Sequence, residues 1–104
     1  MREVFTGTED VKLWLRASVE NGEARVDFEY MCEDFIPNEG TITYSYTFDC
    51  ENTVKLIAFF EKKYEGTLEE MVASAETEEE EPYDFEKTCQ SNNIAYTRRE
   101  HIVI

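Results

Sequence analysis

The sequence lacks the residue patterns on which most catalytic and metal-dependent functions rely. It has a single histidine, His101, and contains no Gly-rich phosphate loop, no HExxH segment and no GxSxG segment. Its three cysteines, Cys32, Cys50 and Cys89, are odd in number and far apart, so neither a disulfide framework nor a zinc site is indicated. The spacing of acidic residues also fits no calcium loop. We therefore expect a protein that is not an enzyme and that binds no metal or cofactor.

Long apolar segments are missing as well. No stretch approaches the roughly 18 apolar residues of a membrane helix, and the first residues contain no apolar run of signal-peptide length. Unpaired cysteines fit a reducing compartment. The length of 104 residues and the hydrophobic content of 41% suffice for one core. We expect one domain over residues 1–104, located in the cytoplasm and without a membrane partner.

Basic residues are scarce relative to acidic ones. The chain has 24 Asp and Glu against 10 Lys and Arg, which gives a formal net charge of -14. Such a field repels nucleic acid and anionic membranes and accelerates the encounter with a cationic protein surface. Direct nucleic-acid binding is therefore disfavoured. Two interpretations stay open: the acidity serves only solubility, or it forms a recognition surface.

A β-hairpin is predicted around Asn21-Gly22, a dipeptide typical of type I′ turns, which is flanked by alternating apolar residues. With these two residues as the loop, Glu20 pairs with Glu23, and a slip of one residue would move charges into the apolar face. The apolar pairs are then Val11–Cys32, Leu13–Tyr30, Leu15–Phe28, Ala17–Val26 and Val19–Ala24, and the polar pairs are Trp14–Glu29, Arg16–Asp27 and Ser18–Arg25.

A third strand and a helix are predicted next. Residues 41–48 alternate with a period of two, whereas residues 54–64 repeat with a period of about 3.6. Asp49 or Asn52 is the expected N-cap of this helix and Gly66 its expected C′ residue. Its core face is expected to consist of Val54, Ile57, Phe60 and Tyr64, widened by Leu56 and Phe59.

The last third of the chain predicts two short helices and a terminal strand. Thr67 and Glu70 form a capping box before an apolar stripe of Leu68, Met71, Val72 and Ala75. Asp84 is the expected cap of a third helix over residues 85–90, and residues 94–104 have strand composition, interrupted at residues 98–101. The order predicts an α+β domain: an antiparallel sheet of three to four strands with two or three helices packed on one face.

Two acidic groups are candidates for partner binding. The first lies in residues 76–86, which contain no Lys or Arg and which are either a solvated loop or a surface whose repulsion a cationic partner relieves. The second surrounds the open end of the hairpin, where a tryptophan lies among carboxylates. The candidate residues are Glu76, Glu78, Glu79, Glu80, Glu81, Tyr83, Asp84 and Phe85 in the first group, and Trp14, Glu29, Glu33 and Asp34 in the second.

The basic cluster Arg98, Arg99 and His101 is expected to be an internal counter-charge for these acids. For His101 a surface position is favoured over a role as a general base.

Residues 41–49, 54–64 and 85–96 resemble segments of the immunity proteins of bacterial contact-dependent growth-inhibition and related polymorphic toxin systems. The resemblance implies a cytosolic protein that neutralises a cognate basic toxin, frequently a nuclease, by covering its active cleft with acidic and aromatic residues. It implies no catalytic residue. The alternative is a nucleic-acid mimic that inhibits a DNA-binding, restriction or CRISPR enzyme, which requires carboxylates spaced like phosphates along an extended face. A third possibility, a small enzyme or ligand-binding domain, requires a sizeable concave pocket.

Overall fold

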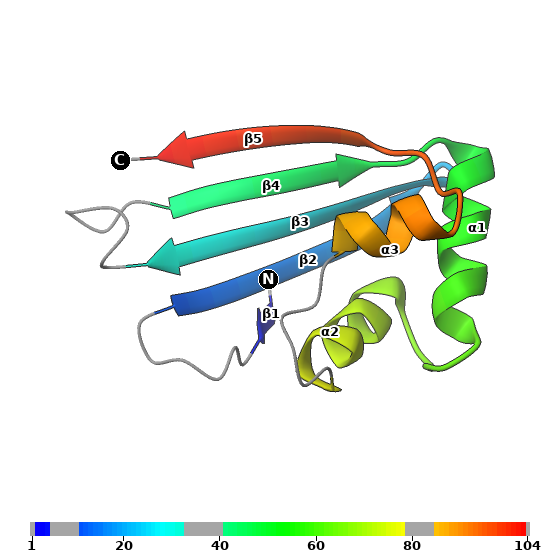
Figure 1. The fold of residues 1–104 in the computed structure, drawn as a ribbon, viewed down its shortest axis with the longest axis horizontal. Coiled ribbons are helices and arrows are strands. Elements are labelled where there is room, and N and C mark those ends of the chain that lie inside the picture. Colours follow the sequence, from blue (N-terminus) through cyan, green and yellow to red (C-terminus); the bar gives the residue numbers. More distant parts are fainter. Residues whose placement is uncertain (1, 5–10, 33–40, 79–84, 104) are drawn as a thin grey trace.

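The fold is a five-stranded antiparallel sheet, with its strands in chain order, and three helices (Figure 1). The computed structural model describes residues 2–4, 11–32, 41–78 and 85–103. The predicted α+β architecture is confirmed, and a short strand, β1, extends the sheet beyond the predicted hairpin. The elements are β1 (Arg2–Val4), β2 (Val11–Glu20), β3 (Glu23–Cys32), β4 (Thr41–Thr47), α1 (Cys50–Glu61), α2 (Leu68–Glu78), α3 (Phe85–Ser91) and β5 (Thr97–Val103).

The β2–β3 hairpin has the predicted register. Asn21 and Gly22 both adopt positive φ, 55° and 78°, as a type I′ turn requires. Every cross-strand pair expected from the alternation is observed, from Glu20–Glu23 at the turn to Val11–Cys32 at the far end. The conformation of the turn and the pairing of apolar residues on one face thus specify the same strand register.

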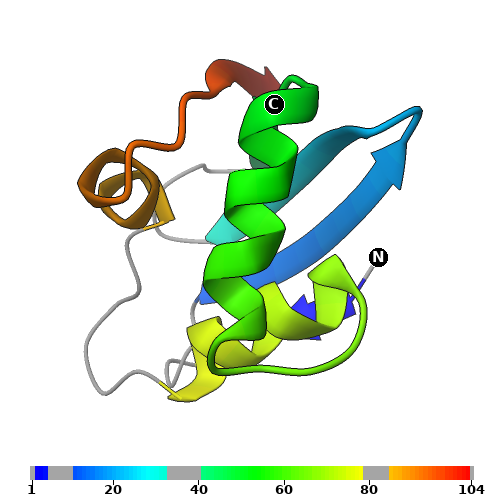
Figure 2. The same ribbon diagram turned by 90° about the vertical axis from the view of Figure 1, so that its right-hand side faces the viewer.

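The sheet has one face toward the helices and one face on which none of the described helices lies (Figure 2). Buried residues of β2 and β3, including Leu15, Val26 and Phe28, belong to the helix side and pack in one core with residues of all three helices. The opposite side, which we call the helix-free face, consists of the alternate strand positions. Paired neighbours across its centre are Arg16, Asp27, Ser45 and Arg99.

Helix α1 stands across the end of the sheet (Figure 2) and begins at the predicted N-cap. The Asp49 carboxylate accepts a hydrogen bond from the Asn52 backbone N–H at 2.8 Å. The expectation for its core face is wrong in one respect, because Val54 is 68% exposed whereas Leu56 is fully buried. The rotation of the helix is set by Thr53, whose Oγ1 accepts the Ala24 backbone N–H of β3 at 2.8 Å.

Helix α2 has the predicted capping box and stripe. The Glu70 N–H donates to Thr67 Oγ1, and the Thr67 N–H donates to Glu70 Oε1, both at 3.2 Å. Gly66 has the expected positive φ, 107°, but lies in the connection between α1 and α2 and not directly after α1. The predicted stripe, Leu68, Met71, Val72 and Ala75, is buried.

The terminal strand β5 contains the charged segment that was expected to interrupt it. Arg98 and Glu100 occupy positions of the helix side, whereas Arg99 and His101 occupy positions of the helix-free face. Arg98 pairs with Glu86 of α3 at 2.9 Å, which agrees with the expected counter-charge role for this residue. Alternating charges are compatible with a strand at a sheet edge, where side chains reach water on both faces.

We predict that Leu56→Ala and Val54→Ala differ in stability although they lie on the same helix. Leu56→Ala removes a fully buried side chain and should lower the free energy of unfolding by about 2 to 5 kcal/mol. Val54→Ala should change it by about 0.5 kcal/mol or less. Urea unfolding followed by circular dichroism measures both; equal losses would contradict the observed rotation of α1.

We predict that Thr53→Val destabilises the fold even though the two side chains are nearly equal in volume. The substitution leaves the buried Ala24 N–H without its acceptor, which costs about 1 to 3 kcal/mol. The exposed Thr47→Val is the matched control and should be nearly neutral. Thermal and urea unfolding check the difference, and a neutral Thr53→Val would contradict the importance of this bond.

Candidate functional site

The structure describes the two ends of the predicted acidic segment, residues 76–78 and 85–86. Glu76 lies in the last turns of α2, and Glu78 is the final residue of that helix. The predicted binding residues that lie outside the described part of the chain are Glu79, Glu80, Glu81, Tyr83 and Asp84 from this segment, and Glu33 and Asp34 from the hairpin group. For these residues the assignment to a binding surface stays a prediction.

Glu76 is half-buried. Loss of water around its carboxylate raises the pKa of Glu76 to about 7, because burial penalises the ionised form. Near neutral pH this side chain therefore carries only part of a charge, and it contributes less to the acidic field than its sequence position indicates.

Phe85 belongs to the core. The side chain is 4% exposed, and its ring lies 5.2 Å from Phe28, 5.1 Å from Tyr46 and 6.5 Å from Phe60, measured between centroids. This burial removes Phe85 from the expected partner-binding surface. The spacing of Phe85 and the fully buried Cys89, one helical turn apart, is the sequence signal that places both on the inner face of α3.

Trp14 and Glu29 are neighbours on the helix-free face, as expected, and both are partly exposed. The same face carries Asp27, which is 7% exposed and accepts a hydrogen bond from Arg25 Nε at 3.1 Å. With Arg16 on the adjacent strand and an arginine of β5 in the same row, this face mixes both signs of charge. In the register of the sheet, Trp14 lies between two glutamate positions, Glu3 of β1 and Glu29 of β3, on a face that as a whole carries both signs of charge.

A third group of carboxylates gathers where the hairpin turn meets the start of α1. The turn approaches the helix closely, since a Cβ atom on Gly22 would lie 3.2 Å from Cys50 Sγ. Glu20 and Glu23 flank the turn, and Asp49 and Glu51 flank the first residue of the helix; all four are exposed. We call these four residues the acidic end.

The acidic end has little counter-charge among the described residues. Lys55 lies 4.0 Å from Glu51, but no ion pair is found for Glu20, Glu23 or Asp49 within the described part of the chain. Hydrogen bonds from Asn52 hold the pKa of Asp49 below its usual range, so its carboxylate stays ionised at any physiological pH. The sequence analysis did not predict this site, although the expected pairing of Glu20 with Glu23 could have indicated it, because like charges directly opposite each other destabilise a hairpin.

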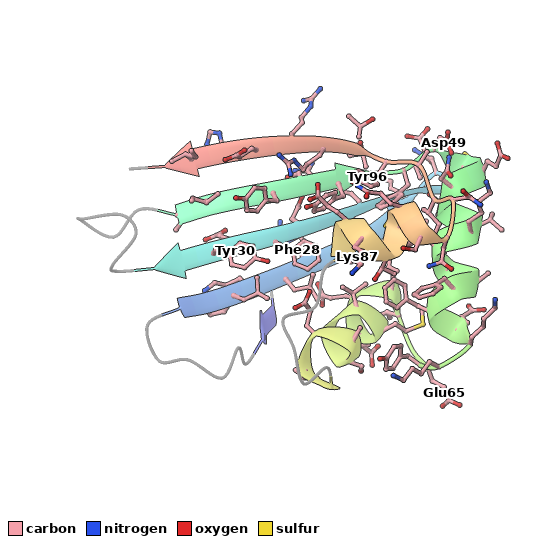
Figure 3. The ribbon with its side chains drawn as sticks, viewed as in Figure 1. Phe28, Tyr30, Asp49, Glu65, Lys87 and Tyr96 are labelled. Carbon is pink, nitrogen blue, oxygen red and sulfur yellow. The ribbon has the colours of Figure 1, made fainter. Side chains whose placement is uncertain are left out.

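A shallow hollow of about 260 Å³ opens beside the acidic end. Its walls come from the hairpin turn, from the connection between β4 and α1, and from the entry to β5, and Figure 3 labels Asp49 and Tyr96 in these segments. The lining residues are Glu23, Thr47, Phe48, Asp49, Ala95, Tyr96 and Thr97. The volume lies below the roughly 300 to 1,000 Å³ of sites for drug-sized ligands.

Comparison with known proteins identifies no relative, since no family model, curated protein or solved structure matches this chain. Within the described residues no group of three or more His, Cys, Asp and Glu is placed to hold a metal ion. Of the described helices, none combines the length and the apolar character needed to cross a membrane.

We predict that Glu76→Gln removes part of the pH dependence of stability. Because the folded pKa of about 7 exceeds the ordinary value of 4.5, the wild type binds this proton more tightly when folded. Its stabilising effect is complete below pH 4.5 and is lost as the pH rises through 7. The variant should therefore gain relative to the wild type across this interval, by about 1 to 2 kcal/mol once partial solvent screening is included.

Urea unfolding at several pH values between 4 and 8 measures this difference. Glu65→Gln, which removes one exposed carboxylate, controls for the change in net charge. A constant difference between Glu76→Gln and the wild type at every pH would contradict the burial of the ionised form.

Proposed function

We propose that this chain is a non-catalytic binding protein that neutralises a basic protein toxin in the cytoplasm, in the manner of the immunity proteins that its sequence resembles. The partner is a cationic protein, with a nuclease as the favoured class, because a nuclease cleft must attract phosphate groups. Carboxylates of this chain would occupy the places of those phosphates.

The observation that carries the proposal is the acidic end. Its carboxylates project from a tight turn and from the start of a helix and not from a long loop, so the backbone that carries them and the Asp49 side chain are fixed before binding. A preorganised surface loses less conformational entropy on binding. The mutual repulsion of these charges has little compensation in the free protein and would be relieved by a cationic surface.

Apolar side chains adjoin the same surface. The exposed large apolar side chains of the described residues are Val19, Val54 and Ile102. Val19 precedes Glu20 at the hairpin turn, and Val54 lies in the second turn of α1, next to Thr53, which bonds to the hairpin. Val54 is therefore one helical turn from Glu51 of the acidic end, whereas Val19 belongs to the helix side of the hairpin and Glu20 and Glu23 to the opposite side. Apolar contacts inside a charged rim are the usual composition of a protein interface.

The alternative, nucleic-acid mimicry, has less support from the described surface. A mimic needs an extended face with regularly spaced carboxylates and few cations. The helix-free face carries Arg16, Arg25, Arg99 and His101 among its described residues, beside Asp27, Glu29 and, at the hairpin turn, Glu20 and Glu23, so cations interrupt its carboxylates. A compact acidic region that covers one cleft fits the exposed carboxylates better.

The proposal is tested with a purified partner. Affinity capture from the native host followed by mass spectrometry supplies candidates, and each candidate is then expressed with and without this chain to measure growth arrest. We expect a basic protein whose toxicity this chain suppresses and whose association rate falls steeply between low and high salt, from values approaching 10⁸ per molar per second. Suppression of toxicity without any salt dependence of the rate would contradict electrostatic recognition.

We predict that Glu20→Gln combined with Glu23→Gln slows association with this partner roughly three- to tenfold at low salt, since the steering field acts locally. Glu61→Gln combined with Glu65→Gln changes the net charge equally at the other end of α1 and should have a much smaller effect. Replacing Glu78 to Glu81 by Gln reports on the acidic segment that starts at the last residue of α2 and continues outside the described residues. Equal effects of the first two variants would show that only net charge matters and would contradict a localised site.

A further inference from the structure

The hollow beside the acidic end is lined largely by groups that accept hydrogen bonds. It is bounded by two carboxylates, from Glu23 and Asp49, and by the two threonines Thr47 and Thr97, whose hydroxyl oxygens can accept hydrogen bonds. Its volume of about 260 Å³ is too small for a typical cofactor and comparable to the space that a large side chain needs.

One wall of the hollow is held rigidly. The Asn52 side chain, which is buried, donates from Nδ2 to Asp49 Oδ1 at 2.9 Å and accepts the Ala95 N–H on its Oδ1 at 2.8 Å. This chain of bonds ties the start of α1 to the entry of β5 across the hollow. The distance between the walls is therefore fixed before any ligand enters, which favours binding.

Asp49 retains free acceptor capacity. The backbone N–H and the side-chain amide of Asn52 both donate to the same oxygen of Asp49, Oδ1. Oδ2 has no hydrogen-bond partner among the described residues, and neither has the carboxylate of Glu23. Two carboxylates with unfilled acceptor positions at one concave site attract a cation with several directed N–H donors.

We propose that this hollow receives a guanidinium group, supplied by an arginine of the protein partner, between Glu23 and Asp49. The inference rests on the proposed function for the source of the arginine, but the hollow itself can be tested without the partner. An arginine is favoured over a lysine because its planar group presents five donors in a fixed array, whereas an ammonium presents three.

The first experiment titrates the full-length protein with Nα-acetyl-arginine amide and follows backbone amide shifts by NMR. We expect saturable shifts at Thr47, Ala95 and Thr97, with a dissociation constant in the millimolar range that is ordinary for a single side chain. Nα-acetyl-citrulline amide has the same shape without the charge, and Nα-acetyl-lysine amide has the charge without the planar group. Both should bind at least tenfold more weakly.

The double variant Glu23→Gln, Asp49→Asn should reduce arginine binding by tenfold or more. Asn is as good an N-cap as Asp, so the start of α1 is retained, and the amide spectrum verifies the fold. Glu61→Gln combined with Glu65→Gln changes the net charge equally at exposed positions outside both the hollow and the acidic end and should leave binding unchanged.

Three outcomes would each contradict the proposal: citrulline or lysine binds as tightly as arginine, the shifts spread over the whole surface, or the double variant binds arginine as the wild type does. Calcium chloride is added in a separate titration, and calcium that displaces arginine at equal concentration would indicate a metal site instead.

With the purified partner, the double variant should weaken affinity at least tenfold more than the control. If the partner binds with strong salt dependence but ignores the double variant, this inference fails while the proposed function stands; if no basic protein binds, the proposed function fails.

Discussion

Three side chains in the first turn of α1 connect this helix to the sheet on two sides. Asp49 caps the helix, Thr53 accepts the Ala24 N–H from β3, and Asn52 accepts the Ala95 N–H at the entry to β5. Each bond satisfies a backbone donor, and an unmade bond to a buried donor is costly. These bonds fix the position of α1 on the sheet and its rotation about its own axis. The packing of its inner face follows from that placement.

The same junction brings like charges together. The hairpin turn lies against the start of α1, and Glu20 and Glu23 are therefore at the same end of the molecule as Asp49 and Glu51. The resulting repulsion works against folding and is offset by the buried core and by the capping bonds. A surface that is held together in this way gains most when a cationic protein covers it, which links the fold to the proposed neutralisation of a basic toxin.

The parts of this structure that local chemistry determines could be predicted from the sequence. The hairpin register follows from the Asn21-Gly22 dipeptide, which favours positive φ, and from the alternation of apolar and polar residues on both sides of it. The rotation of α1 could not, because the bond of Thr53 joins residues far apart in the chain, and the periodicity around Val54 fits two neighbouring faces almost equally well. The hollow could not be predicted from the sequence either, because its walls come from three segments that only the pairing of the strands brings together.

The central claim is that the acidic end is the recognition surface, and amide hydrogen exchange of this chain with its purified partner tests it most directly. The exchange rates of the free and bound chain are compared segment by segment. The proposed interface predicts protection on binding at residues 19–24, 47–55 and 95–97, with little change at residues 61–66 on the other end of α1. Protection confined to the far end of α1 or to the helix-free face, with residues 19–24 unchanged, would contradict it.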